Sequence, residues 1–258
     1  MREWQRQLTS ALASTAERDP KEVIDEIVQI SERFPTEEWP AMLGEARLPD
    51  DVTRSAREIY STYIHRMERA GLAHALATPK LRSTLFSSIC DPEARTAYDR
   101  VSDLFDVLAL APGLRFTMIG CGELPVTAIH VIERAGCEVV CMDVVPAAIT
   151  AAERLSEAFG WSQLHPLLCD GTDYDYGSAD IVYIANMVRP KGAVLRQVAD
   201  TAGRHCKIVL RDPYGLGVLW ADEGQASLPP TLKVRCHGPG SRYLSRDLFL
   251  DWCEGTSR

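Results

Sequence analysis

Residues 116–127 read Phe-Thr-Met-Ile-Gly-Cys-Gly-Glu-Leu-Pro-Val-Thr, and this stretch decides the fold. A short apolar strand runs into Gly120 and Gly122, and a helix begins near Pro125. Asp143 follows Gly122 by 21 positions, at the end of a second apolar strand. Glycines let a turn pass close to a ligand, and a carboxylate one strand over can accept hydrogen bonds from a ribose diol. The first hypothesis is a nucleoside-bearing ligand, and the alternative is a tight turn with nothing bound.

The composition limits the classes of partner. The chain has 258 residues, of which 46% are hydrophobic and 25% are charged, as in ordinary globular proteins. The net charge of −8 argues against a nucleic-acid partner, because no basic stripe exists to neutralise phosphates. Since no apolar run approaches about 20 residues and the first residues contain no signal-peptide core, we expect a cytoplasmic protein without a membrane partner.

The cysteines predict free thiols. The chain contains eight cysteines and no Cys-x-x-Cys pair, and several of them fall inside apolar strands, where cysteine behaves as a small hydrophobe. A reducing compartment fits this pattern better than a disulfide framework or a zinc site. We therefore expect no metal.

Residues 1–110 are predicted to form helices throughout, as a cap on the rest of the chain. Residues 21–34 show apolar side chains at helical spacing, after the start signal Asp19-Pro20. Further helices are expected from residue 50 to about residue 75, and from residue 91 through Leu108.

From residue 114 onward, strands and helices alternate. Candidate strands span residues 115–119, 138–142, 164–169, 180–185 and 207–210, and candidate helices span residues 125–134, 146–159 and 191–203. Apolar strands separated by single helices predict a doubly wound, mostly parallel, Rossmann-like α/β sheet over residues 111–258. Residues 232–252 suggest a terminal antiparallel hairpin, with Gly238-Pro239-Gly240 between its two strands.

The carboxyl ends of the strands supply the candidate ligand-binding residues, because ligands of an open α/β sheet bind there. These residues are Gly120, Cys121, Gly122, Glu123, Asp143, Val144, Asp170, Gly171, Asn186, Arg211 and Tyr214, and Pro125 after the glycine turn is a further candidate. Asp143 suits the ribose hydroxyls, Asp170 the adenine amino group, and Val144 the adenine face. Each has a structural alternative: a solvated turn acid or helix cap for the aspartates, and a core residue for the valine.

A dinucleotide is a weaker hypothesis than a compact nucleoside. Pro125 stands where Gly-x-Gly-x-x-Gly has its third glycine, which permits close helix–strand contact beside a pyrophosphate. S-adenosylmethionine carries no phosphate and does not need that glycine.

This order of motifs resembles the class I S-adenosylmethionine-dependent methyltransferases. Met118 replaces their usual acidic residue, however, and residues 120–127 resemble the Gly-Ser-Gly-x-x-Pro-x-[Ser/Thr] stretch of nicotianamine synthases and bacterial opine-metallophore synthases. Arg211, Gly215 and Leu219-Trp220 also fit the spacing of that group. A helical N-terminal region over the site is a further feature of these enzymes.

The resemblance implies that S-adenosylmethionine is a substrate rather than a methyl donor. These enzymes direct an amine at the γ carbon of the aminocarboxypropyl arm and release methylthioadenosine (MTA). Three carbons on the sulfonium are electrophilic, so positioning selects the product; one held near-attack geometry is worth roughly 7–11 kcal/mol. The attacking amine must be neutral, which requires a nearby base or desolvation.

The resemblance also implies catalytic residues. Tyr98 corresponds to the family tyrosine near the reaction centre, and Asp103 to the acid of the bacterial relatives. Asn186 follows the fourth strand, where methyltransferase-like enzymes place polar catalytic groups. Tyr176, in a loop on the ligand side, is a candidate to face the sulfonium as a cation–π partner. Each of these side chains could instead pack or be solvated.

Arg211 has two interpretations. It could bind the methionyl carboxylate bidentately, or it could be an ion-paired charge at the end of a strand.

Two reactions are open within the resembling group. The cofactor's own amine can close on the γ carbon and give azetidine-2-carboxylate, or the arm can pass to an amino-acid acceptor. We narrowly prefer cyclisation because it needs no acceptor pocket. An ordinary small-molecule methyltransferase and a nucleoside-binding protein without activity are the alternatives. The expected partner is a small molecule, and a homodimer is possible.

Overall fold

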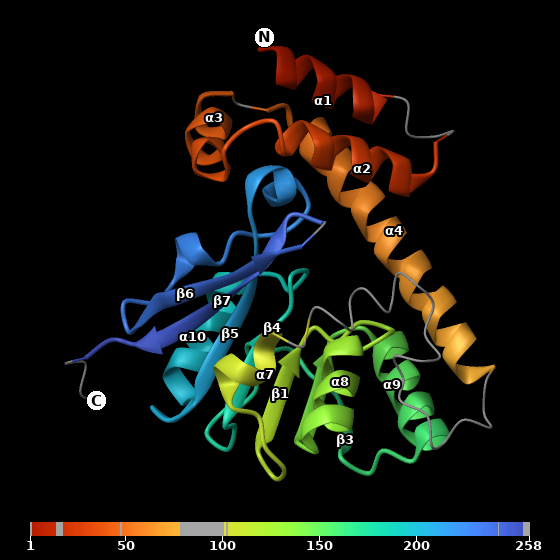
Figure 1. The fold of residues 1–258 in the computed structure, drawn as a ribbon, viewed down its shortest axis with the longest axis vertical. Coiled ribbons are helices and arrows are strands. Elements are labelled where there is room, and N and C mark those ends of the chain that lie inside the picture. The colour runs from red at the N-terminus through yellow and green to blue at the C-terminus, as the bar shows by residue number, and fades with distance from the viewer. Residues whose placement is uncertain are drawn as a thin grey trace.

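The computed structural model describes residues 2–13, 18–46, 48–77, 101, 103–241 and 243–254. Its N-terminal part is helical and its C-terminal part is a sheet with helices (Figure 1). The helical part consists of α1 (Glu3–Ala13), α2 (Pro20–Ser31), the 3₁₀ turn η2 (Thr36–Glu38), α3 (Trp39–Ala46) and α4 (Asp50–Leu76). Short α7 (Asp103–Leu108) leads into the sheet.

Local sequence signals explain why the predicted cap helices form. The Asp19 carboxylate accepts a hydrogen bond of 2.8 Å from the Lys21 N–H, and Pro20 occupies the first turn, where its missing N–H costs nothing. Helix α4 begins directly after Pro49 with two acidic residues in its first turn, which complement the helix dipole. The helices predicted at residues 21–34 and 50–75 are confirmed, with ends that shift by at most three residues. Most of the helix predicted from residue 91 through Leu108 lies outside the described residues, which include its last turns as α7.

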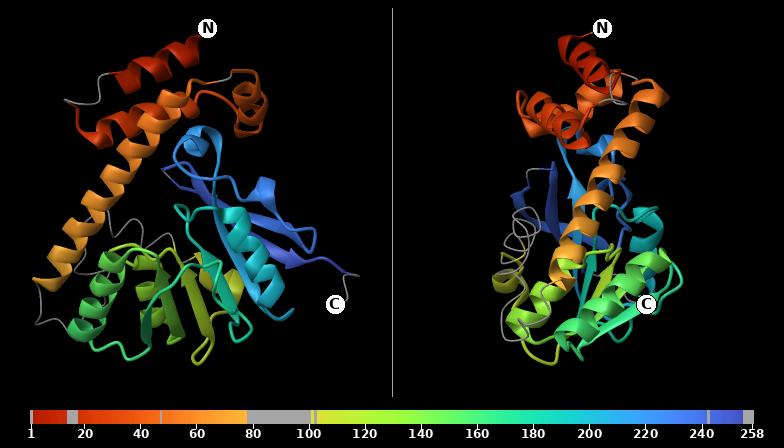
Figure 2. Two further views of the ribbon diagram at one scale, coloured as in Figure 1. Left: turned by 180° about the vertical axis from the view of Figure 1, so that it is seen from behind. Right: turned by 90° about the vertical axis from the view of Figure 1, so that its right-hand side faces the viewer.

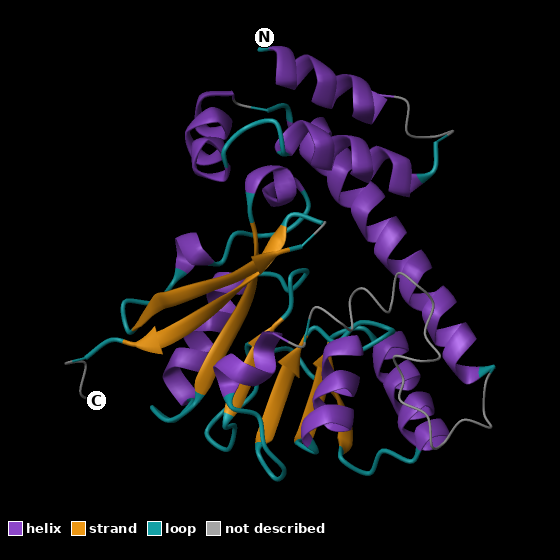
Figure 3. Cartoon of the chain, viewed as in Figure 1, coloured by secondary structure: helices purple, strands orange, loops and turns teal. Residues whose placement is uncertain are grey.

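The predicted doubly wound sheet is confirmed. The strands are β1 (Arg115–Ile119), β2 (Glu138–Asp143), β3 (Leu164–Leu168), β4 (Ile181–Ile184), β5 (Lys207–Pro213), β6 (Leu232–Gly240) and β7 (Ser245–Trp252). They lie in the order β3-β2-β1-β4-β5-β7-β6. Strands β1 to β5 pair in parallel, whereas β7 pairs antiparallel with both β5 and β6 (Figure 3).

Helices cover both faces of this sheet. They are α8 (Val126–Ala135), α9 (Pro146–Phe159) and α10 (Lys191–Thr201). Phe116 and Met118 of β1 belong to an apolar cluster with α7, α8 and α9. Ile119, on the opposite face of the same strand, belongs to the cluster with α10. Successive strand residues point to opposite faces, so an unbroken apolar strand buries both of them.

The terminal hairpin is present, but its turn lies further along the chain than predicted. Gly238-Pro239-Gly240 forms the end of β6, and the chain reverses between Gly240 and Ser245. Pairing with β7 is irregular between His237 and Gly240, and β6 is the edge strand of the sheet. An irregular edge strand tolerates proline because no neighbour needs its missing N–H.

The cap and the sheet region share one apolar cluster. Leu216 and Trp220, in and after the 3₁₀ segment η3 (Gly215–Leu219), pack with buried residues of α1, α2 and α4. The Tyr60 ring of α4 stacks on Trp220 with centroids 4.8 Å apart. This packing sets the course of α4, which runs past the carboxyl ends of the parallel strands toward α9 (Figure 2).

Two general features concern the described residues alone. None of their helices combines the length and apolarity that a bilayer crossing requires. Their seven cysteines are free, and no group of three or more His, Cys, Asp or Glu side chains among them could hold a metal ion.

We expect Gly217→Ala to lower the free energy of unfolding by about 1–3 kcal/mol, as overpacking does. An added Cβ would lie 2.3 Å from the Leu244 carbonyl oxygen, so the backbone of η3 or of the β6–β7 connection must shift. The matched control is Gly44→Ala in α3, where nothing lies within 4 Å of the added atom and helix propensity favours alanine by up to about 1 kcal/mol. Urea unfolding of both variants measures the effects, and equal changes would contradict this interpretation of the packing.

Candidate active site

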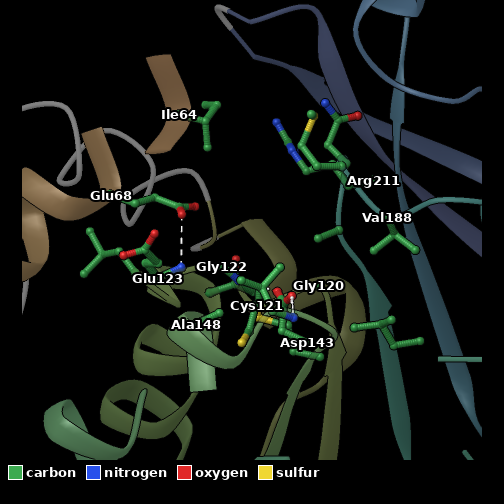
Figure 4. Close-up of a pocket in the computed structure, with 18 of the residues that line it drawn as sticks. Ile64, Glu68, Gly120, Cys121, Gly122, Glu123, Asp143, Ala148, Val188 and Arg211 are labelled. Carbon is green, nitrogen blue, oxygen red and sulfur yellow. Dashed lines mark hydrogen bonds between the residues drawn. The ribbon is translucent and has the colours of Figure 1, made fainter. Parts of the chain in front are cut away.

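A cavity of about 750 Å³ lies between α4, the carboxyl ends of the parallel strands and the β6–β7 connection. Ten of the residues predicted from the strand ends line it: Gly120, Cys121, Gly122, Glu123, Asp143, Val144, Asp170, Gly171, Asn186 and Arg211. Figure 4 shows the labelled members, with Glu68 and Glu123 on the opposite side of the cavity from Arg211.

The turn after β1 requires both of its glycines. Gly120 and Gly122 have φ angles of 78° and 67°, in the left-handed region that favours glycine. A Cβ on Gly120 would lie 2.6 Å from a methyl group of Val188, and one on Gly122 would lie 2.5 Å from the Glu68 carboxylate. The backbone therefore approaches both walls of the cavity closely at this turn.

Asp143 is fixed against the glycine turn. One of its carboxylate oxygens accepts a hydrogen bond of 3.0 Å from the Gly122 N–H, and the other accepts one of 3.0 Å from the Val145 N–H. Each oxygen keeps a further lone pair, so the carboxylate can also accept hydrogen bonds from a ligand diol. The carboxylate lines the cavity at the point where the sequence places a ribose.

The neighbouring residues form a partly apolar platform. Val144 is 60% exposed and lines the cavity. Asp170 accepts hydrogen bonds of 2.9 Å from the backbone N–H and the hydroxyl of Thr172, all through one carboxylate oxygen. The other carboxylate oxygen of Asp170 can accept a hydrogen bond from the exocyclic amine of a base. The Val144 side chain can pack against the flat ring of that base.

Asn186 is a buried amide with no partner. The residue is only 8% exposed, and within the described part of the chain neither its amide oxygen nor its amide nitrogen has a hydrogen-bond partner. Leaving such groups unpaired costs about 1–3 kcal/mol each. Since Asn186 lines the cavity, a polar ligand group is the natural partner.

Both interpretations of Arg211 find support. Its guanidinium donates a hydrogen bond of 3.0 Å to Asp247 and one of 3.3 Å to the Ser245 carbonyl, so it is ion-paired. It also lines the cavity, and a guanidinium has five N–H donors. Among the described residues, Asp247 and Ser245 take up two of these donors, and the others can serve a ligand carboxylate.

Glu68 on α4 was not among the candidates from the sequence. Its carboxylate accepts a hydrogen bond of 3.0 Å from the Glu123 N–H. Burial raises the pKa of Glu68 to about 7, and the nearby Glu123 and Asp143 carboxylates act in the same direction. No local signal marks this residue, because it lies 55 positions before Glu123 in an ordinary amphipathic helix.

Tyrosines of the cap and of the β6–β7 connection were also missed. Tyr60 and Tyr63 of α4 and Tyr243 line the cavity. The hydroxyls of Tyr63 and Tyr243 lie 2.6 Å apart, so one donates to the other across the top of the site. Only the docking of α4 brings these rings together.

Three further predicted residues that the structure describes, Tyr176, Tyr214 and Pro125, do not line the cavity. Tyr176 is fully buried in the cluster with α10, where its hydroxyl donates to the Gly171 carbonyl at 2.7 Å, so its ring is a packing element. The Tyr214 hydroxyl donates to the Ser241 carbonyl, and Pro125 is the residue before α8. Tyr98 lies outside the described residues. Asp103 begins α7, but its side chain lies outside the described part.

No protein-family model matches the sequence. The chain is 25% identical over 137 residues to the L-histidine 2-aminobutanoyltransferase of Yersinia pestis, and the alignment covers 51% of each protein. The chain therefore spans about half the length of this curated relative.

Solved structures match over nearly the whole chain. A point mutant of MtNAS in complex with S-adenosylmethionine superposes with a TM-score of 0.80 at 16% identity, covering 98% of this chain and 99% of that one. MtNAS in complex with MTA and tNA gives a TM-score of 0.80 at 18% identity, covering 96% and 97%. Because the cap and the sheet region both superpose, the chain has the fold of the nicotianamine synthase MtNAS.

Proposed function

We propose that the protein consumes S-adenosylmethionine by directing an amine at the γ carbon of its aminocarboxypropyl arm, with release of MTA. The observation that carries this proposal is the Asp143 carboxylate, held by the Gly122 N–H at the floor of the cavity. The complexes of MtNAS with S-adenosylmethionine and with MTA support the choice of ligand. The aminobutanoyltransferase of Yersinia pestis supports the choice of reaction.

The cavity offers one group for each part of this substrate. Asp143 accepts hydrogen bonds from the ribose hydroxyls, while Val144 and Asp170 hold the adenine. Arg211, on the far side of the cavity, binds the carboxylate of the aminocarboxypropyl arm. The Asn186 amide forms hydrogen bonds with the polar atoms of the same arm. The glycine turn lies between these groups, and the absence of side chains at Gly120 and Gly122 leaves room for the arm beside Val188 and Glu68.

The reaction needs a base. Near neutral pH the substrate amine is largely an ammonium group, so it must first give up one proton to a base. The amine lone pair then forms the new N–C bond at the γ carbon as the C–S bond breaks, and the bonding pair leaves on sulfur as neutral MTA. Glu68 faces the glycine turn, and its pKa of about 7 suits proton acceptance near neutral pH.

Of the two possible reactions, cyclisation and transfer to an acceptor, the charges of the cavity favour cyclisation. Among the described residues that line it, only His65, Arg189 and Arg211 can carry positive charge. Both arginines are ion-paired, but the Arg189 side chain is 35% exposed and donates to the Trp220 carbonyl, whereas Arg211 is buried at the strand ends. One buried guanidinium suits one carboxylate, that of the substrate itself. Transfer to an amino-acid acceptor is the second candidate, and the similarity to the aminobutanoyltransferase of Yersinia pestis favours it.

Incubation of the purified protein with S-adenosylmethionine alone tests both the release of MTA and the preference for cyclisation. We expect MTA together with azetidine-2-carboxylate, identified by chromatography and mass spectrometry. S-adenosylhomocysteine as the nucleoside product would instead identify a methyltransferase. MTA that forms only after an amino acid is added would favour transfer over cyclisation. The control is Asp143→Asn, which should form far less of either nucleoside at limiting S-adenosylmethionine because its binding is weakened.

A further inference from the structure

We infer that Asp247 is a positioning residue that aims the Arg211 guanidinium at the α-carboxylate of the substrate. The site would thereby select sulfonium nucleosides that carry a carboxylate over those that lack one. This inference rests on the proposed function, and it concerns a residue that does not itself line the cavity.

Sheet register brings the three side chains involved to one face. Arg211 of β5 lies directly opposite Asp247 of β7 in an antiparallel pair. Tyr183 of β4 pairs with Val209, two residues before Arg211, so its ring points to the same side. Arg211, Asp247 and Tyr183 therefore form a row across three neighbouring strands.

One oxygen of Asp247 joins this row. It accepts a hydrogen bond of 3.0 Å from the Tyr183 hydroxyl and another of 3.0 Å from the Arg211 guanidinium. The second Arg211 nitrogen donates to the Ser245 carbonyl, also on β7. Both anchors of the guanidinium thus come from the same strand, and they fix the plane of the group.

Burial makes this alignment consequential. Tyr183, Arg211 and Asp247 are only 1%, 5% and 6% exposed. A buried guanidinium needs compensation for lost hydration, and Asp247 supplies it. Tyr183 and Arg211 reach the cavity, whereas Asp247 stands behind them, so Asp247 acts on a ligand through Arg211. A planar group held in advance binds a carboxylate bidentately without a further ordering cost.

Two substitutions of Asp247 separate geometry from charge. Asp247→Asn keeps the acceptor oxygen in place and removes the charge, whereas Asp247→Glu keeps the charge and displaces the acceptor by one methylene. If Asp247 acts by positioning, Asp247→Glu should weaken binding of S-adenosylmethionine by about tenfold, the effect of one charged hydrogen bond. Asp247→Asn should change it by no more than about threefold.

The reference probe is decarboxylated S-adenosylmethionine, which has the same sulfonium and amine but no carboxylate. Calorimetry of both ligands gives the ratio of their dissociation constants. We expect Asp247→Glu to lower this ratio toward one and Asp247→Asn to preserve it. In an Arg211→Met background, neither substitution should change the ratio further.

A buried acid outside the cavity serves as the control for stability. Asp212 pairs with Lys191 at 3.2 Å and does not line the cavity, so Asp212→Asn should lower the melting temperature without changing the ratio. A larger effect of Asp247→Asn than of Asp247→Glu, or equal weakening of both ligands, overturns the inference. Failure of the wild-type protein to bind S-adenosylmethionine overturns the proposed function instead, and the two failures are therefore distinguishable.

Discussion

We expect Glu68→Gln to lower the turnover of S-adenosylmethionine by about 10²–10⁴-fold, the usual contribution of a general base. Binding should change little, because the amide oxygen can still accept the hydrogen bond from the Glu123 N–H. Stopped assays that quantify MTA, with calorimetry of S-adenosylmethionine, separate turnover from affinity.

The matched control is Glu123→Gln. Glu123 lines the same side of the cavity, but its carboxylate is already paired with Arg69 at 2.9 Å. We expect this variant to retain most of the activity. A Glu68→Gln enzyme as active as the Glu123→Gln enzyme would remove Glu68 from the mechanism.

The pH profile offers an independent test of Glu68. A base must be deprotonated, so the rate of the wild-type enzyme should rise with pH through about 7, the pKa of Glu68. Glu68→Gln should remove this limb of the profile. If the limb persists in Glu68→Gln, another group supplies it.

The same pKa has a consequence for stability. The folded protein holds the Glu68 proton up to about pH 7, whereas an unfolded glutamate releases it near its ordinary value of 4.5. Between these values the folded state binds more protons, so the contribution of Glu68 to the unfolding free energy is present at low pH and is lost as the pH rises. Urea unfolding across this range should therefore show a smaller decline for Glu68→Gln than for the wild type.

The sequence predicts the sheet side of the cavity well because its signals are local. The glycine turn after β1, the acid that ends β2 and the polar residues at or just after the ends of β3, β4 and β5 all stand next to apolar runs in the sequence. Parallel strands bring their carboxyl ends to one edge of the sheet. Residues at the ends of predicted strands can therefore be expected to lie close together.

The α4 side could not be predicted in the same way. Glu68 and Tyr63 lie on a helix whose pattern only predicts that one face is buried, not what covers it. Their place in the site depends on the packing of Tyr60 on Trp220, a contact between residues 160 positions apart. Tyr176 illustrates the reverse case. It lies in a loop on the ligand side and was therefore a candidate, but its ring packs in the core and its hydroxyl donates to the Gly171 carbonyl.

Asp143→Asn should weaken binding of S-adenosylmethionine by about 100-fold or more, because two hydrogen bonds from the ribose to a charged acceptor are each worth about 1.5–3 kcal/mol. The substitution also disturbs the turn itself. The carboxylate accepts from two backbone N–H groups, those of Gly122 and Val145, and an amide has only one oxygen to offer them. One backbone donor therefore loses its partner, and the glycine turn loses part of its support.

Comparison of ligands distinguishes these two effects. MTA keeps the ribose and lacks the arm, so direct loss of the ribose contact should weaken MTA and S-adenosylmethionine by similar factors. A displaced glycine turn would affect S-adenosylmethionine more, because the arm passes over that turn. Asp180→Asn is the control: Asp180 accepts from the Arg115 N–H at the opposite end of the sheet, and its loss should leave both dissociation constants unchanged. If Asp143→Asn binds both ligands as tightly as Asp180→Asn does, no ribose rests on Asp143 and the proposed function fails with it.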